Sequence, residues 1–391
     1  MNSTLAAVAA FCLLGAPAAQ AGAGYLFHDY GTGLAGLGVV PAPVQGYTPY
    51  WGGNLTTWGG PFFGPRGTTD VFANGVVHAE VLTLDNDDDL NPAGYQSSGL
   101  LAFGQNDLDS YSVAGFVSGT CSTSCTSGPL HAAYWVYPGG SQTTWVFTDL
   151  HPAAYTASLA QGTNGAVQVG WGQDSANVYH PLVWQGTAAS AALLPLPGAL
   201  TQGAAAAVAS NKSALAVGWG NGADNVVHPL AWTPTGGTYA ATDLLPAGAT
   251  FGVAVATDNN YIGGTVITPS SAGQFHAAYW DGAAASTFVD INPPPQGKLT
   301  YLASSVYSVT VKSGSHTVYM AGLAVVDNRS RTGHAMLWVG PKFKPIDLQK
   351  VIGSGFVESV ATGVDLGGNV CGSALDTSGI WHKVYWSFNG P

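Results

Sequence analysis

The sequence predicts an all-β chain folded as a β-propeller, and three observations lead to that prediction. Only 8% of the 391 residues are charged, whereas 54 are glycine, a composition that suits short strands and tight turns better than salt-bridged helices. A five-residue pattern that runs from a histidine to a tryptophan recurs about every fifty residues. Each repeat has room for four short strands, which is the size of one propeller blade.

The histidine-to-tryptophan pattern occurs in six copies, whose histidines lie 49, 48, 48, 58 and 48 residues apart. The copies are His131 with Trp135, His180 with Trp184, His228 with Trp232, His276 with Trp280, His334 with Trp338, and His382 with Trp386. The segment from His78 to Leu82 precedes His131 by 53 residues and keeps the histidine without the tryptophan. We therefore expect about seven four-stranded blades, with copies ending near Leu82 and at the six tryptophans, or six blades if residues 31–84 form an insertion.

Two further elements recur in phase with the histidines. A glycine-containing β-rich segment precedes most histidines by about ten residues, as in Val169–Gly172 and Ile262–Thr265. An Asp-Leu or Asp-Ile pair follows the tryptophan and predicts a fourth strand; its aspartates are Asp149, Asp243, Asp290 and Asp347. A parallel β-helix would repeat at about half this length, and a helical solenoid would need long runs with a 3.6-residue period. The spacing favours blades.

The ends of the chain predict how the ring closes. Only five residues follow Trp386, so the last copy lacks its Asp-Leu strand. The segment Tyr25–Tyr30 is an apolar run that contains Asp29. We expect it to supply the missing outer strand and to join the first part of the chain to the last blade.

The order of these elements resembles that of the bacterial extracellular repeats known as the HAF family, which are named after a His-Ala-Phe triplet. The resemblance covers about residues 85–386. This chain has Ala-Ala, Pro-Leu or Ala-Met after the histidine, where the family has Ala-Phe. It implies a repeat architecture and export, and it implies no particular reaction.

The N-terminal 21 residues have the pattern of a signal peptide. Leu5 to Ala18 are apolar, and Ala19-Gln20-Ala21 offers small residues at the two positions that signal peptidase reads. We expect residues 22–391 to form one exported propeller domain, and no later apolar stretch is long enough to span a membrane. The net charge of −11 argues against nucleic acid or anionic lipid as a partner, so we expect an extracellular ligand such as a glycan or a protein.

The repeated histidines and tryptophans are predicted to be structural. A residue that recurs once per blade at one position belongs to the scaffold, and the ring symmetry keeps the copies too far apart to share a metal ion. We expect each histidine to donate to a neighbouring backbone carbonyl and each tryptophan to fill the space between blades.

Non-repeated residues are the candidates for ligand binding. Trp171 and Trp219 each lie between two glycines in adjacent copies and are followed by amides and carboxylates. An aromatic ring beside such groups suits a sugar, although both rings could also pack within the blades. The candidate ligand-binding residues are Trp171, Asp174, Asn177, Trp219, Asn221, Asp224 and Asn225.

Calcium is the one candidate cofactor, and Cys121 with Cys125 is the candidate disulfide. Asp85, Asp87 and Asp89 alternate as in a calcium loop, but Leu90 and Gln96 occupy positions where an EF-hand has glycine and glutamate. The competing reading is a solvated acidic loop. The two cysteines lie four residues apart and could close a small loop or stay as free thiols, which would leave Cys371 as a buried residue.

No catalytic motif stands out. The chain has no Gly-x-Ser-x-Gly elbow beside a base, no phosphate-binding Walker loop and no His-Glu-x-x-His helix. The leading hypothesis is therefore a non-catalytic binding or scaffold protein. The alternatives are a carbohydrate-active enzyme, a lyase or a hydrolase, and a lectin-like module around the two tryptophans.

Overall fold

A computed structural model shows the chain as an all-β propeller. The structure describes residues 21–22, 25–32, 76–77, 80–81, 95, 97–105, 111–121, 125–137, 146–209, 214–258, 260–312, 316–327, 332–365 and 367–388. In this part of the chain no helix is both long enough and apolar enough to cross a membrane.

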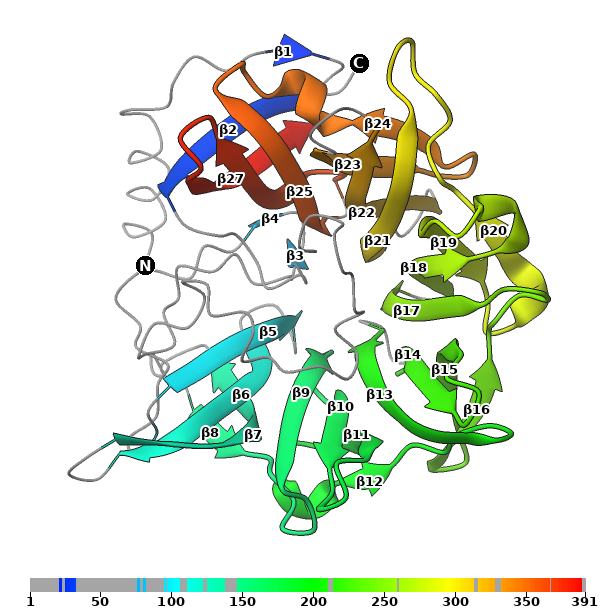
Figure 1. Ribbon diagram of the computed structural model, residues 1–391. Helices are drawn as coiled ribbons and strands as arrows, with labels where there is room; N and C mark the ends of the chain where they lie inside the picture. The colour runs from blue at the N-terminus through cyan, green and yellow to red at the C-terminus, as the bar shows by residue number, and fades with distance from the viewer. Residues whose placement is uncertain are drawn as a thin grey trace.

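The described residues form six four-stranded antiparallel units around a common centre, with β5, β9, β13, β17, β21 and β25 innermost (Figure 1). The units follow one another in chain order, and β2 completes the sixth. They are β5 (Ser97–Gln105), β6 (Tyr111–Cys121), β7 (Cys125–Tyr137) and β8 (Val146–Asp149); β9 (Ala157–Thr163), β10 (Gln168–Gln173), β11 (Tyr179–Trp184) and β12 (Ala192–Leu193); β13 (Leu200–Val208), β14 (Ala216–Gly222), β15 (Val227–Thr235) and β16 (Thr238–Asp243); β17 (Phe251–Asp258), β18 (Tyr261–Ile267), β19 (His276–Asp281) and β20 (Phe288–Asp290); β21 (Tyr301–Lys312), β22 (Thr317–Val326), β23 (Gly333–Val339) and β24 (Lys344–Asp347); and β25 (Phe356–Val364), β26 (Val370–Asp376), β27 (Trp381–Phe388) and β2 (Tyr25–Thr32).

The third and fourth units share one continuous sheet, because a single parallel pair, Val227 with Phe251, links β15 to β17. Short strands and short 3-10 turns complete the fold. β1 (Ala21–Gly22) pairs with β2, and β3 (Val76–Val77) pairs with β4 (Glu80–Val81). Short 3-10 turns lie at η2 (Ala188–Ser190), η3 (Pro269–Ser271), η4 (Ala285–Thr287) and η5 (Leu348–Val351).

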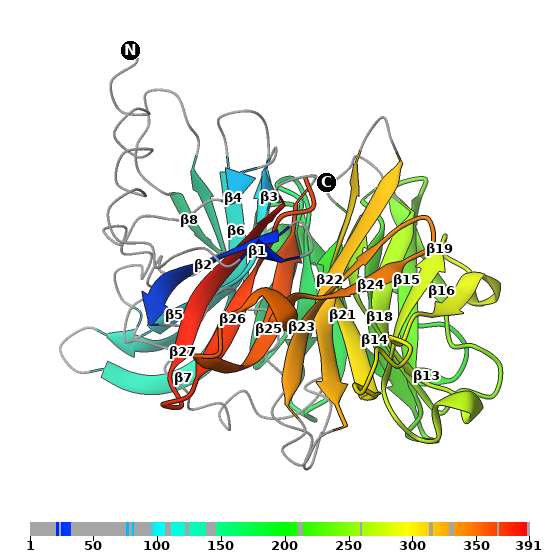
Figure 2. The same cartoon turned by 90° about the horizontal axis from the view of Figure 1, so that it is seen from above.

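The structure does not support a count of seven blades. His78 and Leu82, which would end the first copy, lie outside the described residues, and only the two-residue strands β3 and β4 are described near them. The prediction that the N-terminal strand supplies the missing outer strand of the last blade is confirmed. β2 pairs antiparallel with β27 from Tyr25 opposite Phe388 to Thr32 opposite His382, and Figure 2 shows the two strands side by side.

The recurring glycine of the second strand is required by the first strand of the same unit. A Cβ on Gly264 would lie 2.0 Å from the Val253 carbonyl oxygen, and one on Gly322 would lie 2.0 Å from the Ser305 carbonyl oxygen. The first strand shifts register at this level, which brings its carbonyl against the second strand. Only glycine leaves room for that approach.

The repeated tryptophans form the core between units. All six are at most 1% exposed. Three of them also donate their indole N–H to a backbone carbonyl of the preceding unit: Trp232 to Pro195 at 2.6 Å, Trp280 to Leu244 at 3.0 Å and Trp338 to Ile291 at 2.9 Å. Each of these rings therefore combines apolar packing with a polar contact across the boundary between units.

Candidate functional site

Each repeated histidine is paired with a carboxylate, so the expectation of a backbone carbonyl partner is wrong. In four units the Nδ1 atom of the histidine on the third strand meets the aspartate that ends the fourth strand. The distances are 2.9 Å for His131 and Asp149, 2.6 Å for His228 and Asp243, 2.7 Å for His276 and Asp290, and 3.1 Å for His334 and Asp347. Third and fourth strands are antiparallel neighbours, so the start of one lies beside the end of the other.

Two units vary this arrangement. In the second unit Leu193 stands where the others have aspartate, and His180 turns its Nε2 atom to Asp174 in its own hairpin at 2.9 Å. In the last unit His382 lies between two carboxylates. Its Nδ1 atom is 3.0 Å from Asp29 on β2, and its Nε2 atom is 3.2 Å from Asp376. The aspartate of the N-terminal strand thus takes the place that a fourth-strand aspartate has elsewhere.

The boundary between successive units, here called the seam, occurs in a polar form. The residue after the histidine is alanine in this form, and its backbone N–H donates to a buried serine on the first strand of the next unit. The three bonds, from Ala132 to Ser158, Ala277 to Ser304 and Ala335 to Ser359, are each 2.9 Å long. The same serines also bond the side chain two residues after the aspartate, which is His151, Asn292 or Gln349.

The seam also occurs in an apolar form. Proline follows the histidine at Pro181 and Pro229, so there is no N–H to satisfy, and the next unit has Gly203 and Gly252 at the serine position. A Cβ on Gly252 would lie 2.7 Å from the Pro229 Cδ atom. Serine therefore accompanies an N–H donor, and glycine accompanies a proline ring that fills the space of a side chain.

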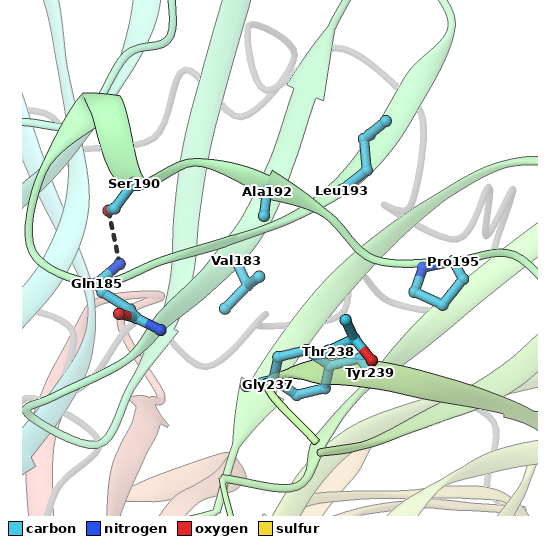
Figure 3. A pocket seen from close by; sticks show the side chains of 9 residues that line it. All are labelled: Val183, Gln185, Ser190, Ala192, Leu193, Pro195, Gly237, Thr238 and Tyr239. Carbon is cyan, nitrogen blue, oxygen red and sulfur yellow. Dashed lines mark hydrogen bonds between the residues drawn. The ribbon is translucent and has the colours of Figure 1, made fainter. Parts of the chain in front are cut away.

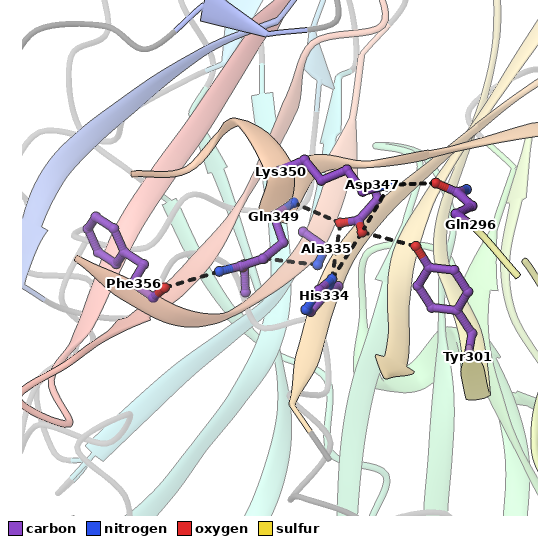
Figure 4. Close-up of polar contacts among 9 residues, drawn as sticks. Gln296, Tyr301, His334, Ala335, Asp347, Gln349, Lys350 and Phe356 are labelled. Carbon is purple, nitrogen blue, oxygen red and sulfur yellow. Dashed lines mark hydrogen bonds and ion pairs between the residues drawn. The ribbon is translucent and has the colours of Figure 1, made fainter. Parts of the chain in front are cut away.

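Among the carboxylates paired with a repeated histidine, Asp347 has the least exposed side chain (Figure 4). Its side chain is 0% exposed and accepts from His334, from the Tyr301 hydroxyl at 3.0 Å and from the Gln349 N–H at 3.1 Å. The Lys350 Nζ atom lies 3.9 Å away. Burial and the neighbouring Asp347 carboxylate raise the pKa of Tyr301, which therefore stays a protonated donor.

The first described unit has a similar network around Asp149. Its carboxylate accepts from Tyr95 at 2.7 Å, from His131 and from the His151 N–H. Burial opposes its ionisation, but these hydrogen bonds outweigh burial and hold the pKa of Asp149 below its ordinary value. The His131 and His151 rings stack at 3.9 Å, and burial and then the charge of His131 lower the pKa of His151. Burial and the Asp149 hydrogen bond raise the pKa of Tyr95 to about 12.

The candidate tryptophans lie inside the molecule. Trp171 is 9% exposed and Trp219 is 3% exposed, and both pack in one apolar cluster with Phe116, Leu159 and Val253. Neither ring offers an exposed face on which a sugar could stack, so the expectation of a stacking platform at these two residues is wrong. Sequence reasoning could not place these rings, because the cluster that buries them combines residues of four units.

The polar residues that follow the two tryptophans shape hairpin turns. Asp174 Oδ1 accepts the N–H groups of Ala176 and Val178, and Asp224 Oδ1 accepts that of Val226. Asn177 and Asn225 have φ angles of 63° and 58°, the left-handed conformation that asparagine tolerates in turns. Asn221 is the exception, because it lies within β14.

The cysteine and calcium predictions meet the limits of the described residues. Cys121 and Cys125 are paired in the register of β6 and β7, but their side chains are not described. Cys371 is buried and free, and burial raises the pKa of its thiol to about 11. Asp85, Asp87 and Asp89 lie outside the described residues. Within those residues no three His, Cys, Asp or Glu side chains gather as a metal site would require.

A cleft that sequence reasoning missed lies at the rim between the second and third units (Figure 3). Its volume is about 350 Å³, and its lining residues are Val183, Gln185, Ser190, Ala192, Leu193, Pro195, Gly237, Thr238 and Tyr239. Leu193 is 62% exposed there. The signal that could have found it was the absence of an Asp-Leu pair from this copy.

Comparison with known proteins gives a distant likeness in structure alone. No protein-family model and no curated protein matches the chain. Trypanosoma rangeli sialidase is 10% identical with a TM-score of 0.41, over 75% of this chain and 55% of that one. The same sialidase in complex with sialic acid is 10% identical with a TM-score of 0.42, over 85% and 59%. The chain thus spans little more than half the length of these sialidases. Its own strand pairing and the radial arrangement of its sheets identify it as a β-propeller.

Proposed function

We propose that this chain is an exported, non-catalytic β-propeller that serves as a rigid scaffold for binding an extracellular ligand. The observation that carries the proposal is the use made of the repeated polar residues. The repeated histidine pairs with the aspartate of its own unit, as His276 does with Asp290. The seam serine of the next unit accepts the backbone N–H after that histidine and bonds the side chain two residues after the aspartate, as Ser304 does with Ala277 and Asn292. Side chains engaged in this way hold the ring, so recognition falls to residues that differ from unit to unit.

Such residues lie beside the repeated histidines, near the start of the third strand of each unit. The position just before the histidine holds a half-buried aromatic side chain in three units, namely Tyr179, Phe275 and Trp381. The equivalent residue is Val227 in the third unit and Gly333 in the fifth. Partly exposed aromatic rings on a rigid frame are typical anchors for a glycan or a protein loop. We infer that these rings contact the ligand.

Export is part of the proposal and rests on the first 21 residues. The apolar run and the Ala-Gln-Ala site support removal of a signal peptide, and the HAF-type order of motifs supports the same location. Expression of the full chain in a bacterial host, followed by fractionation and N-terminal sequencing, tests it. Processing that leaves Gly22 first in an extracellular or periplasmic fraction is expected, and an unprocessed cytoplasmic chain would contradict export.

The binding function is tested with the purified chain on a glycan array and on a panel of extracellular matrix proteins. Phe275→Ala is expected to weaken any signal found, whereas Val289→Ala, a change at an exposed rim residue on β20, should leave it unchanged. The alternative, a carbohydrate-active enzyme, is tested with chromogenic glycosides, including a sialoside, and with polyuronates. Turnover of any of these substrates would overturn the non-catalytic proposal.

A further inference from the structure

Trp219 and Asn221 present two polar atoms toward the same seam. They lie two residues apart on β14, so their side chains point to the same side of the sheet. Their partners across the sheet are Pro229 and Val227 on β15. Trp219 packs in one cluster with Val253 of β17, so this side of β14 faces the first strand of the next unit.

Both polar atoms are buried without a partner. The Trp219 Nε1–H donor and the Asn221 Oδ1 acceptor have no exposed surface, and neither has a hydrogen bond within the described structure. Trp219 as a whole is 3% exposed, whereas Asn221 is half-buried. A buried donor and a buried acceptor left unpaired are costly, and the cost is avoided when one group satisfies both.

The next seam shows how the same position can be satisfied from within the protein. Thr265 on β18 lies opposite Ala277, just as Trp219 lies opposite Pro229. The Thr265 hydroxyl bonds Ser305 on the first strand of the following unit. Trp219 instead packs with Val253, whose side chain accepts no hydrogen bond. The seam beside Trp219 therefore contains a polar pair that its neighbouring unit does not complete.

We propose that Trp219 Nε1 and Asn221 Oδ1 form a binding site for a single hydroxyl group. The hydroxyl oxygen accepts the indole N–H, and its hydrogen is donated to the amide oxygen, so one O–H group satisfies both atoms. A water molecule and a small polyol both carry this group. Asn221 is the more exposed residue of the pair. This inference is independent of the proposed function, because it does not involve the aromatic residues before the histidines.

The experiment uses the full chain with ¹⁵N-labelled tryptophan, in which Trp219→Phe identifies the indole N–H signal of Trp219. Magnetisation transfer from water to that N–H reports a bound water molecule. Titration with glycerol reports a polyol through a shift of the same signal. Asn221→Leu removes the acceptor, and urea denaturation compares the stability of both variants with that of Trp171→Phe, the matched change at the equivalent position of the preceding unit.

The outcomes separate the sources of the hydroxyl and can reject the site. Transfer from a long-lived water molecule, together with lower urea midpoints for Trp219→Phe and Asn221→Leu than for Trp171→Phe, supports a site filled by water. A glycerol-induced shift that Asn221→Leu abolishes supports a site open to polyols. The proposal is overturned if neither signal is seen and both variants are at least as stable as the unaltered chain.

Discussion

Ser304 gives a direct test of how the propeller is held together. It is 3% exposed, accepts the Ala277 N–H at 2.9 Å and donates to Asn292 Oδ1 at 2.6 Å. Ala277 is fully buried, so Ser304→Ala leaves its N–H without an acceptor and without access to water. An unsatisfied buried donor costs about 1–3 kcal/mol. We expect the unfolding free energy, measured by urea denaturation, to fall by that amount.

The apolar seam allows the same reasoning to be tested by rescue. Ala277→Pro alone places a ring against Ser304, and Ser304→Gly alone leaves the Ala277 N–H unpaired. The two changes together reproduce the combination found at Pro229 and Gly252, where ring and glycine fit. We therefore expect the double variant to lose less stability than the sum of the single variants, by about 0.5–3 kcal/mol.

Tryptophan fluorescence and far-ultraviolet circular dichroism should give coincident urea transitions for this comparison to hold. Ser378→Ala, a change of the same type at an exposed turn residue, is the control and should shift stability by no more than about 0.5 kcal/mol. Strict additivity of the two changes at positions 277 and 304, or an unchanged Ser304→Ala variant, would refute the account of the seam.

Three further predictions follow from burial and charge. Tyr25 is 2% exposed and donates to the Gly368 carbonyl at 3.0 Å, so Tyr25→Ala should cost about 3–5 kcal/mol in urea denaturation; a loss below about 1 kcal/mol would show that β2 adds little to closure. The Cys371 thiol, with its pKa raised to about 11 by burial, should resist iodoacetamide at neutral pH and react only in denaturant; rapid labelling of the native chain would contradict its burial. The lowered pKa of Asp149 contributes stability above the ordinary carboxyl range that is lost as pH falls through the folded value, so Asp149→Asn should flatten the acid limb of a stability–pH curve, and an unchanged limb would count against it.

The period of the sequence predicted the architecture well, for a physical reason. A sheet that packs on copies of itself needs the same residue at the same place each time, so the tryptophans could be read as core before any neighbour was known. Asp29 could be matched to the fourth-strand aspartates in the same way, because the last copy lacks an Asp-Leu strand after Trp386. The expected count of seven blades is not supported. It depended on the segment from His78 to Leu82, which keeps the histidine of the repeated pattern and lacks its tryptophan.

The predictions that were wrong concern contacts between strands and between units. The partners of the histidines were assigned to the backbone, although aspartates recur in phase and end the strand that lies beside each histidine in most units. The cluster that buries Trp171 draws residues from several units, which no local pattern reveals. The serine of each polar seam lies 24 to 27 residues after the alanine that it accepts from, and this varying loop length hides the pairing from a search for fixed spacing.

The pairing of β2 with β27 has a consequence for the order of assembly. β2 precedes every other strand of the six units in the chain, whereas its neighbour β27 is the last of the described strands. During synthesis the five units from β5 to β24 can form as an open arc. β2 is made first but stays unpaired until its partner β27 has been synthesised. β27 lies between β26 and β2, so a chain that stops short of β27 leaves the edges of both strands unpaired and prone to join other chains.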